Sequence, residues 1–327
     1  MTRCTVAIPV FNRATLIRGA IESVLAQDVA DLELLVVDNC STDGTCETVE
    51  SYGHSRVRLV RNAENLGLAG NLTRCLELSE GTYLRILCSD DRLVPGCLRR
   101  ELACMDANPS VVVLSTRNRL VNEGGREIGT LGHFLTPGIY SGPHVVPGLL
   151  WVQGHYGHNP LNYPSGVLLR RDAAVRAGVF DTRLRIALDF DFFLRVLALG
   201  DLGVWDDVGA EILLHSDQES STLGDAVQIR ELLVIVDRHV DALRHERFDQ
   251  GMRDQLAGLS FGLSLRHRLH GRLEDSRHHV EIQAHTGVTR MRRIRALSRV
   301  MLLRLLRRVF GRLVLPAALR DSRRQFA

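Results

Sequence analysis

The first hundred residues alternate between short apolar runs and stretches with a helical period. The apolar runs are residues 5–10, 32–38, 57–61 and 82–88, and helical stretches follow them at 15–26, 44–51, 68–79 and 95–107. Parallel strands need a crossover connection, so strands that alternate with helices indicate βαβ units. The pattern predicts an α/β fold with a Rossmann-like, mostly parallel mixed sheet flanked by helices.

Polar residues stand directly after each of the four predicted strands. The clusters are residues 9–13, Asp38 with Asn39, residues 65–71 and residues 89–91. Each cluster alone also fits a turn, because Asn, Asp and Gly favour turns. Ligands of such sheets bind beyond the carboxyl ends of the strands, so four clusters at that edge favour a binding site.

The sequence lacks the usual glycine-rich phosphate loops. No GxGxxG follows the first strand, and no GxxxxGK[ST] occurs anywhere. A bound nucleotide would therefore need another counter-charge for its diphosphate. The adjacent carboxylates Asp90 and Asp91 would supply one by holding a divalent cation, since Mg²⁺ and Mn²⁺ prefer oxygen ligands.

Composition indicates a soluble globular protein, because 45% of the 327 residues are hydrophobic and 24% are charged. The seven cysteines, an odd number without CxxC spacing, argue against a zinc ribbon or a secreted disulfide framework. The sequence begins MTRCTVAIPVFN, without the apolar region of a signal peptide, and no uncharged apolar stretch is long enough for a spanning helix. We expect a cytoplasmic location.

Charge is distributed unevenly along the chain. Residues 290–327 contain 12 arginines and one acid, a net charge of +11, whereas the remainder carries −8. Helical periods replace the strand–helix alternation after residue 222, at 225–245, 249–270 and 274–284. The sequence therefore predicts a helical C-terminal extension that ends in a basic tail.

Residues 297–315 have the period of a basic amphipathic helix. Its apolar face would hold Leu302, Leu305, Leu306, Val309, Phe310 and Leu313, and its basic face Arg304, Arg307, Arg308 and Arg312. Such a helix fits an anionic membrane surface, here the cytoplasmic face of the inner membrane. The alternative is packing on the preceding domain of the same chain or on a partner subunit. Nucleic acid is not an expected partner, because aromatic residues are almost absent among these arginines.

Several segments, in their order and spacing, resemble the family 2 glycosyltransferases, which have the glycosyltransferase-A fold. The segments are VAIPVFNRATLIRGAIESVLAQ, LELLVVDNCSTDGT, ENLGLAGN, ILCSDDRLVPGCL, YPSGVLLRRDAAVRAGVFDTRL and LDFDFFLRVLALGD. The resemblance covers residues 3–222. It implies a catalytic domain over 1–222, with a nucleotide-sugar half (1–116) and an acceptor half (117–222). The helical region would then span 223–327.

The resemblance also implies roles for individual residues. Donor-binding residues would be Pro9, Phe11, Arg13, Asp38, Asn65, Gly67, Asn71, Ser89 and Asp90. The ligands of Mn²⁺ or Mg²⁺ would be Asp90, Asp91 and His215. Asp189 would be the catalytic base, although an Asp at the start of a predicted helix also fits a capping role. Asp191 is its nearest rival.

The resemblance implies an inverting, metal-dependent glycosyltransferase of hexosyltransferase type, with a UDP-sugar donor as the first choice. The acceptor would be a glycan or a lipid-linked acceptor in polysaccharide or glycoconjugate biosynthesis, and a homo-oligomer is left open. The chain departs from the family pattern at Gly70, Cys88 and Leu188. These changes keep open a non-catalytic nucleotide- or glycan-binding protein on a membrane. A sugar nucleotidyltransferase of related architecture is the second alternative.

Overall fold

The computed structural model describes most of the chain, in two compact units. The described residues are 2–156, 159–215, 225–239, 246–269, 273–286, 288–289, 291–297 and 323–324. Unit 1 comprises Met1–Pro143, Leu161–Ser216 and Ser322–Ala327, and unit 2 comprises His144–Pro160 and Asp217–Asp321. The predicted boundary between 222 and 223 lies outside the described residues and stays a prediction.

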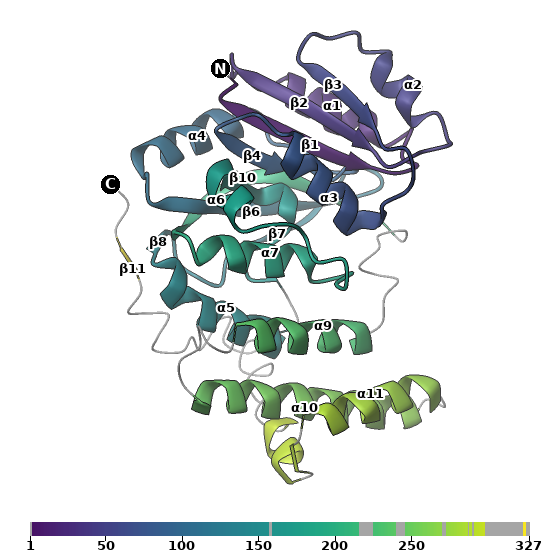
Figure 1. Ribbon diagram of the computed structural model, residues 1–327, viewed down its shortest axis with the longest axis vertical. Helices are drawn as coiled ribbons and strands as arrows, with labels where there is room; N and C mark the ends of the chain where they lie inside the picture. The colour runs from purple at the N-terminus through teal and green to yellow at the C-terminus, as the bar shows by residue number, and fades with distance from the viewer. Residues whose placement is uncertain are drawn as a thin grey trace. The chain divides into compact units, whose positions relative to one another are not determined.

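A mixed sheet with helices on both faces forms unit 1 (Figure 1). Among the described residues its strands are β1 (Cys4–Val10), β2 (Leu32–Asp38), β3 (Val57–Arg61), β4 (Tyr83–Ile86), β5 (Arg92–Leu93), β6 (Val111–Asn122), β7 (Glu127–Leu131), β8 (Gly138–Tyr140), β9 (Val167–Arg170), β10 (Asp201–Leu214) and β11 (Arg323–Arg324). The path through the sheet is β11-β8-β10-β6-β9-β4-β1-β2-β3, with β5 beside β10 and β7 beside β6.

The helices of the first half follow the predicted alternation with the strands. The structure has α1 (Ile17–Leu25), α2 (Thr45–Glu50), α3 (Gly67–Leu78) and α4 (Cys97–Ala107), and later α5 (Gly142–Tyr156), the 3-10 turn η1 (Pro164–Gly166), α6 (Arg171–Arg176) and α7 (Leu188–Leu197). Strands β3, β2, β1 and β4 run parallel to one another. Their carboxyl ends therefore share one edge of the sheet, as the sequence predicts.

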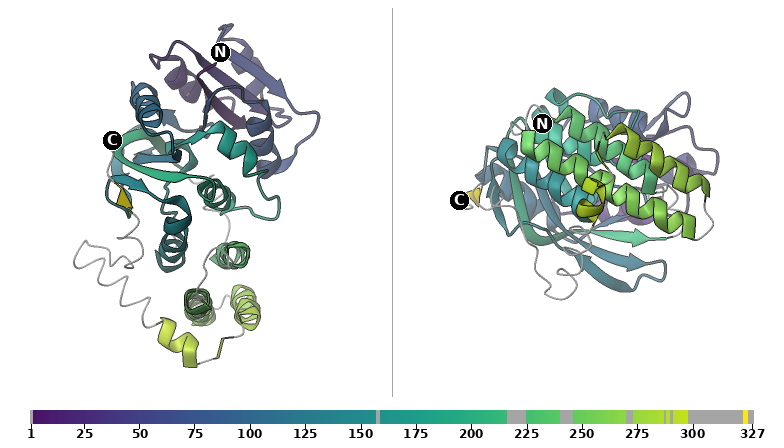
Figure 2. Two further views of the ribbon diagram at one scale, coloured as in Figure 1. Left: turned by 60° about the vertical axis from the view of Figure 1, so that its left-hand side comes forward. Right: turned by 90° about the horizontal axis from the view of Figure 1, so that it is seen from below.

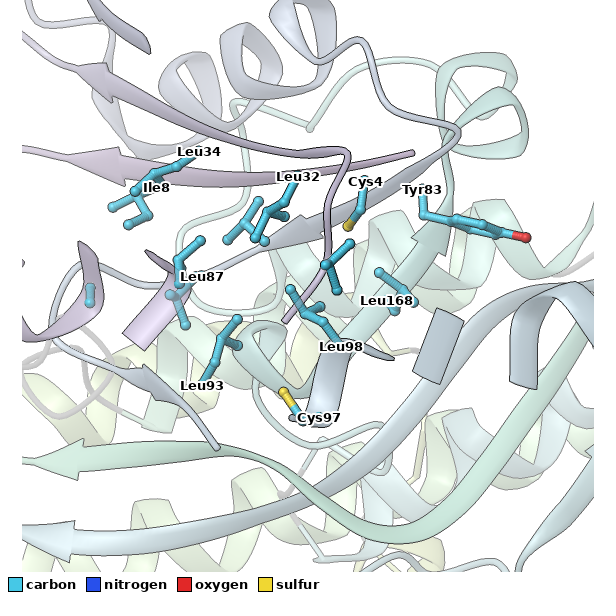
Figure 3. Packing of buried hydrophobic residues seen from close by; sticks show 14 of the residues in the cluster. Cys4, Ile8, Leu32, Leu34, Tyr83, Leu87, Leu93, Cys97, Leu98 and Leu168 are labelled. Atoms are coloured by element: carbon cyan, nitrogen blue, oxygen red, sulfur yellow. The ribbon is translucent and has the colours of Figure 1, made fainter. Parts of the chain in front are cut away.

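Alternation of side chains along the strands separates the two faces of this sheet. Ile8 and Leu34 share a buried layer with Leu98 of α4 (Figure 3). Helix α1 also packs in this layer, whereas α3 contacts β1 and β2 from the other face. Side chains alternate between faces along a strand, so nearly continuous apolar strands can be covered on both sides.

The second half of the sheet is mixed, which completes the predicted α/β architecture. Strand β9 lies antiparallel between β4 and β6, and β10 then runs parallel to β6. The helix α5 was not expected, because Pro147 lies inside it and proline removes a helical hydrogen bond. The fold class is confirmed, and strand β4 ends two residues earlier than the predicted strand at 82–88.

A fully buried ion pair joins α4 to the central strand β4. Arg85 of β4 and Glu101 of α4 have side chains that are 0% and 2% exposed. The second nitrogen, Arg85 Nη1, donates to the backbone oxygen of Ser165 at 3.0 Å. Two charges in a low-dielectric interior compensate each other only while both remain, so each depends on its partner.

Unit 2 is helical in its described residues. It contains most of α5, together with α9 (Asp225–Arg238), α10 (Glu246–Leu269) and α11 (Leu273–His285). Helices α10 and α11 lie side by side (Figure 2). The buried Ser260 hydroxyl of α10 donates to the backbone oxygen of His279 of α11 at 2.8 Å. Most of the predicted amphipathic helix at 297–315 lies outside the described residues. No helix within the described ranges has the length and apolarity needed to cross a membrane.

We predict that Glu101→Gln lowers the free energy of unfolding by about 3–5 kcal/mol, because the buried Arg85 charge loses its counter-charge. Urea unfolding followed by circular dichroism measures the change. The matched control is Arg100→Ala in the same helix, which breaks a half-exposed pair with Asp207. That control should cost less than about 1 kcal/mol. Equal effects of the two substitutions would contradict the prediction.

Candidate active site

Hydrogen bonds join the loop that follows β1 to the loop that follows β2, at the carboxyl edge of the sheet. The Asn12 backbone N–H donates to Ser41 Oγ at 2.9 Å, and the Thr42 N–H donates to Asn12 Oδ1 at 2.9 Å. The Ala14 N–H donates to Asp43 Oδ2 at 3.0 Å. Hydrogen bonds from Thr45 and Ala14 outweigh desolvation and lower the pKa of Asp43. These hydrogen bonds therefore hold together two loops that are about 30 residues apart in sequence.

Both loops contain a non-glycine residue in the left-handed region. Asn12 has φ 52° and Cys40 has φ 66°. Asn tolerates this conformation, but for other residues it costs about 1–2 kcal/mol. The surrounding hydrogen bonds hold the backbone there, which is common at binding sites.

Asp38 is the last residue of β2, directly before the second of these loops, and it is fully buried. Its Oδ2 accepts the Ser41 N–H at 3.0 Å and lies 3.6 Å from Arg61 Nε. Its Oδ1 accepts no hydrogen bond from the described residues. Burial and the Asp38 carboxylate raise the pKa of the nearby Cys46 to about 11. A buried carboxylate oxygen without a donor is costly, so this atom is suited to an N–H group of a ligand.

Four asparagines hold the loop that follows β3. Asn62 Nδ2 donates to Asn39 Oδ1 at 3.0 Å and to Asn71 Oδ1 at 2.9 Å. Asn39 Nδ2 donates to Asn65 Oδ1 at 2.7 Å, and Asn71 Nδ2 donates to the Val37 backbone oxygen at 3.0 Å. Asn65 and Asn71 therefore support the loop through their amides. Their predicted place beneath the nucleotide stays a prediction.

Gly67 and Asn62 complete this network. Gly67 has φ 70°, a backbone conformation that glycine adopts without steric cost, and its N–H donates to Asn65 Oδ1 at 2.9 Å. Asn62 is not among the site residues predicted from the sequence. Its only signal was an asparagine directly after a predicted strand, a position that a turn also explains.

Cys88, Ser89, Asp90 and Asp91 form a tight corner after β4. The Asp91 N–H donates to the Cys88 backbone oxygen at 3.1 Å, which places Ser89 and Asp90 at the tip. Potential metal-ligating atoms of Cys88, Asp90 and Asp91 lie within 4.8 Å of one another. Asp90 Oδ2 is 2.9 Å from His215 Nε2, although the two residues are 125 positions apart. The structure thus brings the predicted metal ligands together.

The thiol of Cys88 and the carboxyl groups of Asp90 and Asp91 differ in how well they could bind a cation. Asp91 is buried, and both its oxygens accept hydrogen bonds, Oδ2 from Ser165 Oγ at 2.6 Å and Oδ1 from the Leu213 N–H at 3.1 Å. Desolvation and the neighbouring Asp90 raise the pKa of Asp91 well above its usual value. Desolvation, with Asp91 and Asp90 beside it, also raises the pKa of the Cys88 thiol. A protonated thiol is a poor ligand for a hard cation.

Asp90 and His215 therefore fit a divalent cation best. Their side chains are 16% and 8% exposed, so the described residues shield both from most of the solvent. One carboxylate and one imidazole leave room for phosphate oxygens and water, which Mn²⁺ and Mg²⁺ usually retain. The predicted ligand role of Asp91 stays a prediction, and its oxygens already accept protein hydrogen bonds.

Asp189 and its rival Asp191 both stand in the first turn of α7. Asp191 is fully buried and pairs with Arg195, with Oδ2 3.0 Å from Nε. Asp189 is half-buried, and its charge helps raise the pKa of both Cys88 and Tyr163. Asp189 thus lies within electrostatic range of the corner that residues 88–91 form after β4. This arrangement favours Asp189 over Asp191 as a proton acceptor for a substrate.

The remaining predicted donor residues line the same edge. Pro9 lies near the end of β1, in register with Val37 of β2, and Phe11 follows the strand with 43% of its surface exposed. Arg13 Nη1 donates to the Asn12 backbone oxygen at 3.3 Å. Ser89 is buried at the tip of the corner. Their contacts with a nucleotide stay predictions.

A mostly parallel sheet with polar residues at its carboxyl edge is typical of ligand-binding α/β proteins. Comparison with known proteins identifies the family. The model of the family "Glycosyl transferase family 2" matches residues 5–173. The chain belongs to glycosyl transferase family 2. The matched segment contains the loops after β1–β4 and Ser165, but neither Asp189 nor His215.

Curated relatives resemble about 60% of the chain. An uncharacterized protein of Mycobacterium tuberculosis is 30% identical over 59% of this chain and 61% of its own length. The succinoglycan biosynthesis protein ExoO of Rhizobium meliloti is 30% identical over 60% of this chain and 56% of its own length. The matches thus span only about 60% of these relatives.

Solved structures show the same fold at low sequence identity. TarS residues 1–349 of S. aureus, in complex with UDP-GlcNAc, has a TM-score of 0.66 at 18% identity, over 87% of this chain and 80% of that one. The mannosyltransferase PcManGT of Pyrobaculum calidifontis, in complex with GDP-Man and Mn²⁺, has a TM-score of 0.54 at 19% identity, over 98% and 85% of the two chains. The predicted glycosyltransferase-A fold is confirmed.

Proposed function

We propose that this protein is an inverting, metal-dependent glycosyltransferase that uses a UDP-sugar. The observation that carries the proposal is the gathering of three acidic groups at one edge of the sheet: Asp38, the Asp90–His215 pair and Asp189. Sugar transfer needs a site for the nucleotide, compensation for the leaving diphosphate and a base for the acceptor hydroxyl. Each group matches one of these needs.

The choice of uracil follows from the hydrogen bonds of Asp38. Its Oδ2 already accepts the Ser41 N–H, so Oδ1, which accepts no hydrogen bond from the described residues, is the oxygen that best suits a single ligand N–H. Uracil presents one ring N–H between two carbonyl groups, which matches one acceptor. Guanine presents a ring N–H and an amino group side by side, a pair of donors that a carboxylate binds best when both of its oxygens are free. The TarS structure holds UDP-GlcNAc, although PcManGT holds GDP-Man.

Asp90 and His215 would hold the cation, with Asp91 behind them. A bound Mn²⁺ or Mg²⁺ supplies Lewis-acid stabilisation of the leaving diphosphate. Asp189 accepts the proton of the acceptor hydroxyl as the hydroxyl attacks the anomeric carbon. One base and no second carboxylate acting as nucleophile correspond to a single displacement, which inverts the configuration of that carbon.

The acceptor is a glycan or a lipid-linked acceptor in polysaccharide or glycoconjugate biosynthesis. The relative ExoO is a succinoglycan biosynthesis protein, and a chondroitin synthase of Pasteurella multocida is 25% identical over 77% of this chain. Both names refer to polysaccharide synthesis. A non-catalytic binding protein is the alternative, and binding of nucleotide without turnover would favour it.

For the donor, we predict that UDP raises the melting temperature of the protein in MnCl₂ more than GDP or CDP does, since ligands of the native state stabilise it. Asp38→Asn should remove most of the preference for UDP, weakening its binding by about 10-fold or more, because the amide cannot reproduce both carboxylate acceptors. Differential scanning fluorimetry measures both effects. The control is Asp31→Ala, an exposed acid before β2. A larger shift with GDP would overturn the choice of base.

For catalysis, we predict that EDTA and Asp90→Asn each abolish release of UDP from a panel of UDP-sugars with acceptor glycans. Asp189→Asn should lower kcat by about 10²–10⁴ while UDP binding persists, because only the proton acceptor is lost. The control is Asp172→Asn, an exposed acid in the first turn of α6. Full activity in EDTA would contradict the metal role, and full activity of Asp189→Asn would contradict the base.

For location, the basic segment 290–327 attaches the protein to the cytoplasmic face of the membrane. Each arginine near an anionic surface contributes about 1 kcal/mol, and salt screens the attraction. The protein should sediment with phosphatidylglycerol vesicles but not with phosphatidylcholine vesicles, and less so at high salt. Replacing Arg304, Arg307, Arg308 and Arg312 by Gln should abolish the effect. Equal binding to both vesicles would contradict this proposal.

A further inference from the structure

Ser165, which sequence analysis did not assign to the site, lies directly behind the acidic corner. It belongs to η1 and is 0% exposed. Its hydroxyl donates to Asp91 Oδ2 at 2.6 Å and accepts the Cys88 backbone N–H at 3.0 Å. One hydroxyl thus binds the first and the last residue of the corner, and Asp90 lies between them.

The same contacts reach β10, the strand that His215 directly follows. The second oxygen of Asp91, Oδ1, accepts the Leu213 N–H at 3.1 Å. Leu213 stands two residues before His215, near the end of β10. Asp91 therefore links the β4 corner to β10, and the Asp90–His215 contact of 2.9 Å spans the two segments that it links.

Ser165 itself is fixed by the buried core. Its backbone oxygen accepts a hydrogen bond from Arg85 Nη1 at 3.0 Å, and Arg85 is paired with Glu101. At the next residue, Gly166, an added Cβ would lie 2.0 Å from the side chain of Asn118, which belongs to β6. This segment therefore packs closely against β6. The hydroxyl of Ser165 thus has little freedom to move away from the corner.

We infer that Ser165 is a positioning residue of the metal centre, acting through Asp91. Buried hydrogen bonds are directional and are lost only at a high cost, so they can fix the geometry of the groups that they join. Groups of this kind behind metal ligands orient those ligands and tune their affinity. Asp91 is then a link between two segments, and Asp90 and His215 contact the cation. The inference rests on the proposed function, because it needs a cation at this site.

The test measures Mn²⁺ binding directly, by loss of the free Mn²⁺ signal in electron paramagnetic resonance, with UDP present and separately with GDP. Ser165→Ala should weaken Mn²⁺ binding about 10-fold, and saturating Mn²⁺ should restore most of kcat. The matched control is Ser79→Ala. Ser79 is equally buried, its hydroxyl donates to the Leu76 backbone oxygen and accepts from Arg171, and it lies at the end of α3 away from the corner. Its Mn²⁺ affinity should not change.

A second pair of variants tests whether Asp91 links the two segments while Asp90 binds the cation. The same pair tests the inference if Ser165→Ala does not fold. Asp91→Asn keeps the shape and an acceptor for the Leu213 N–H, so it should weaken Mn²⁺ binding about 10-fold, whereas Asp90→Asn should abolish it. Unchanged Mn²⁺ affinity of Ser165→Ala would overturn the inference, and so would equal losses in Asp90→Asn and Asp91→Asn. Absence of Mn²⁺ binding by the wild type with either nucleotide would instead overturn the metal-dependent function itself.

Discussion

Parallel pairing of β3, β2, β1 and β4 is the constraint on which the site depends. Parallel strands deliver all their carboxyl ends to one edge, and each crossover helix returns the chain to the opposite edge. The residues that leave these strands are therefore neighbours, although they come from distant parts of the sequence. Asp38 and Asp90, 52 positions apart, lie at one edge for this reason alone.

Buried polar contacts then convert proximity into fixed geometry. Asn62 holds the loop after β3, Ser41 holds Asp38, and Ser165 holds the corner after β4. Asn62 and Ser165 each use one short side chain to bind two partners, and Ser41 uses its backbone N–H. A buried hydrogen bond is lost at a higher cost than an exposed one. The site is therefore supported by groups that would not touch a substrate. Substitutions there should alter binding without removing a reacting atom.

Sequence reasoning predicted the strand–helix alternation, the carboxyl edge and most of the candidate residues. Local patterns sufficed, because apolar periodicity and turn residues are encoded within short segments. It missed α5, because proline inside a helix contradicts the local rule. It also missed Asn62 and Ser165, whose environments arise from long-range contacts. Nothing in the segment YPSG indicates that its serine meets a carboxylate 74 positions earlier.

The sequence by itself determined the family, the α/β class and the clusters of acidic and amide residues after the strands. Only the tertiary structure decided which carboxylates remain available to a ligand. Asp90 and Asp91 are adjacent and chemically identical, yet Asp91 is bound on both oxygens by Ser165 and Leu213, while Asp90 meets His215. Likewise Asp191 is fully buried and pairs with Arg195, whereas Asp189, in the same helical turn, is half-buried. Burial and hydrogen bonding act through space, so residues of the same type acquire different chemistry only once the chain has folded.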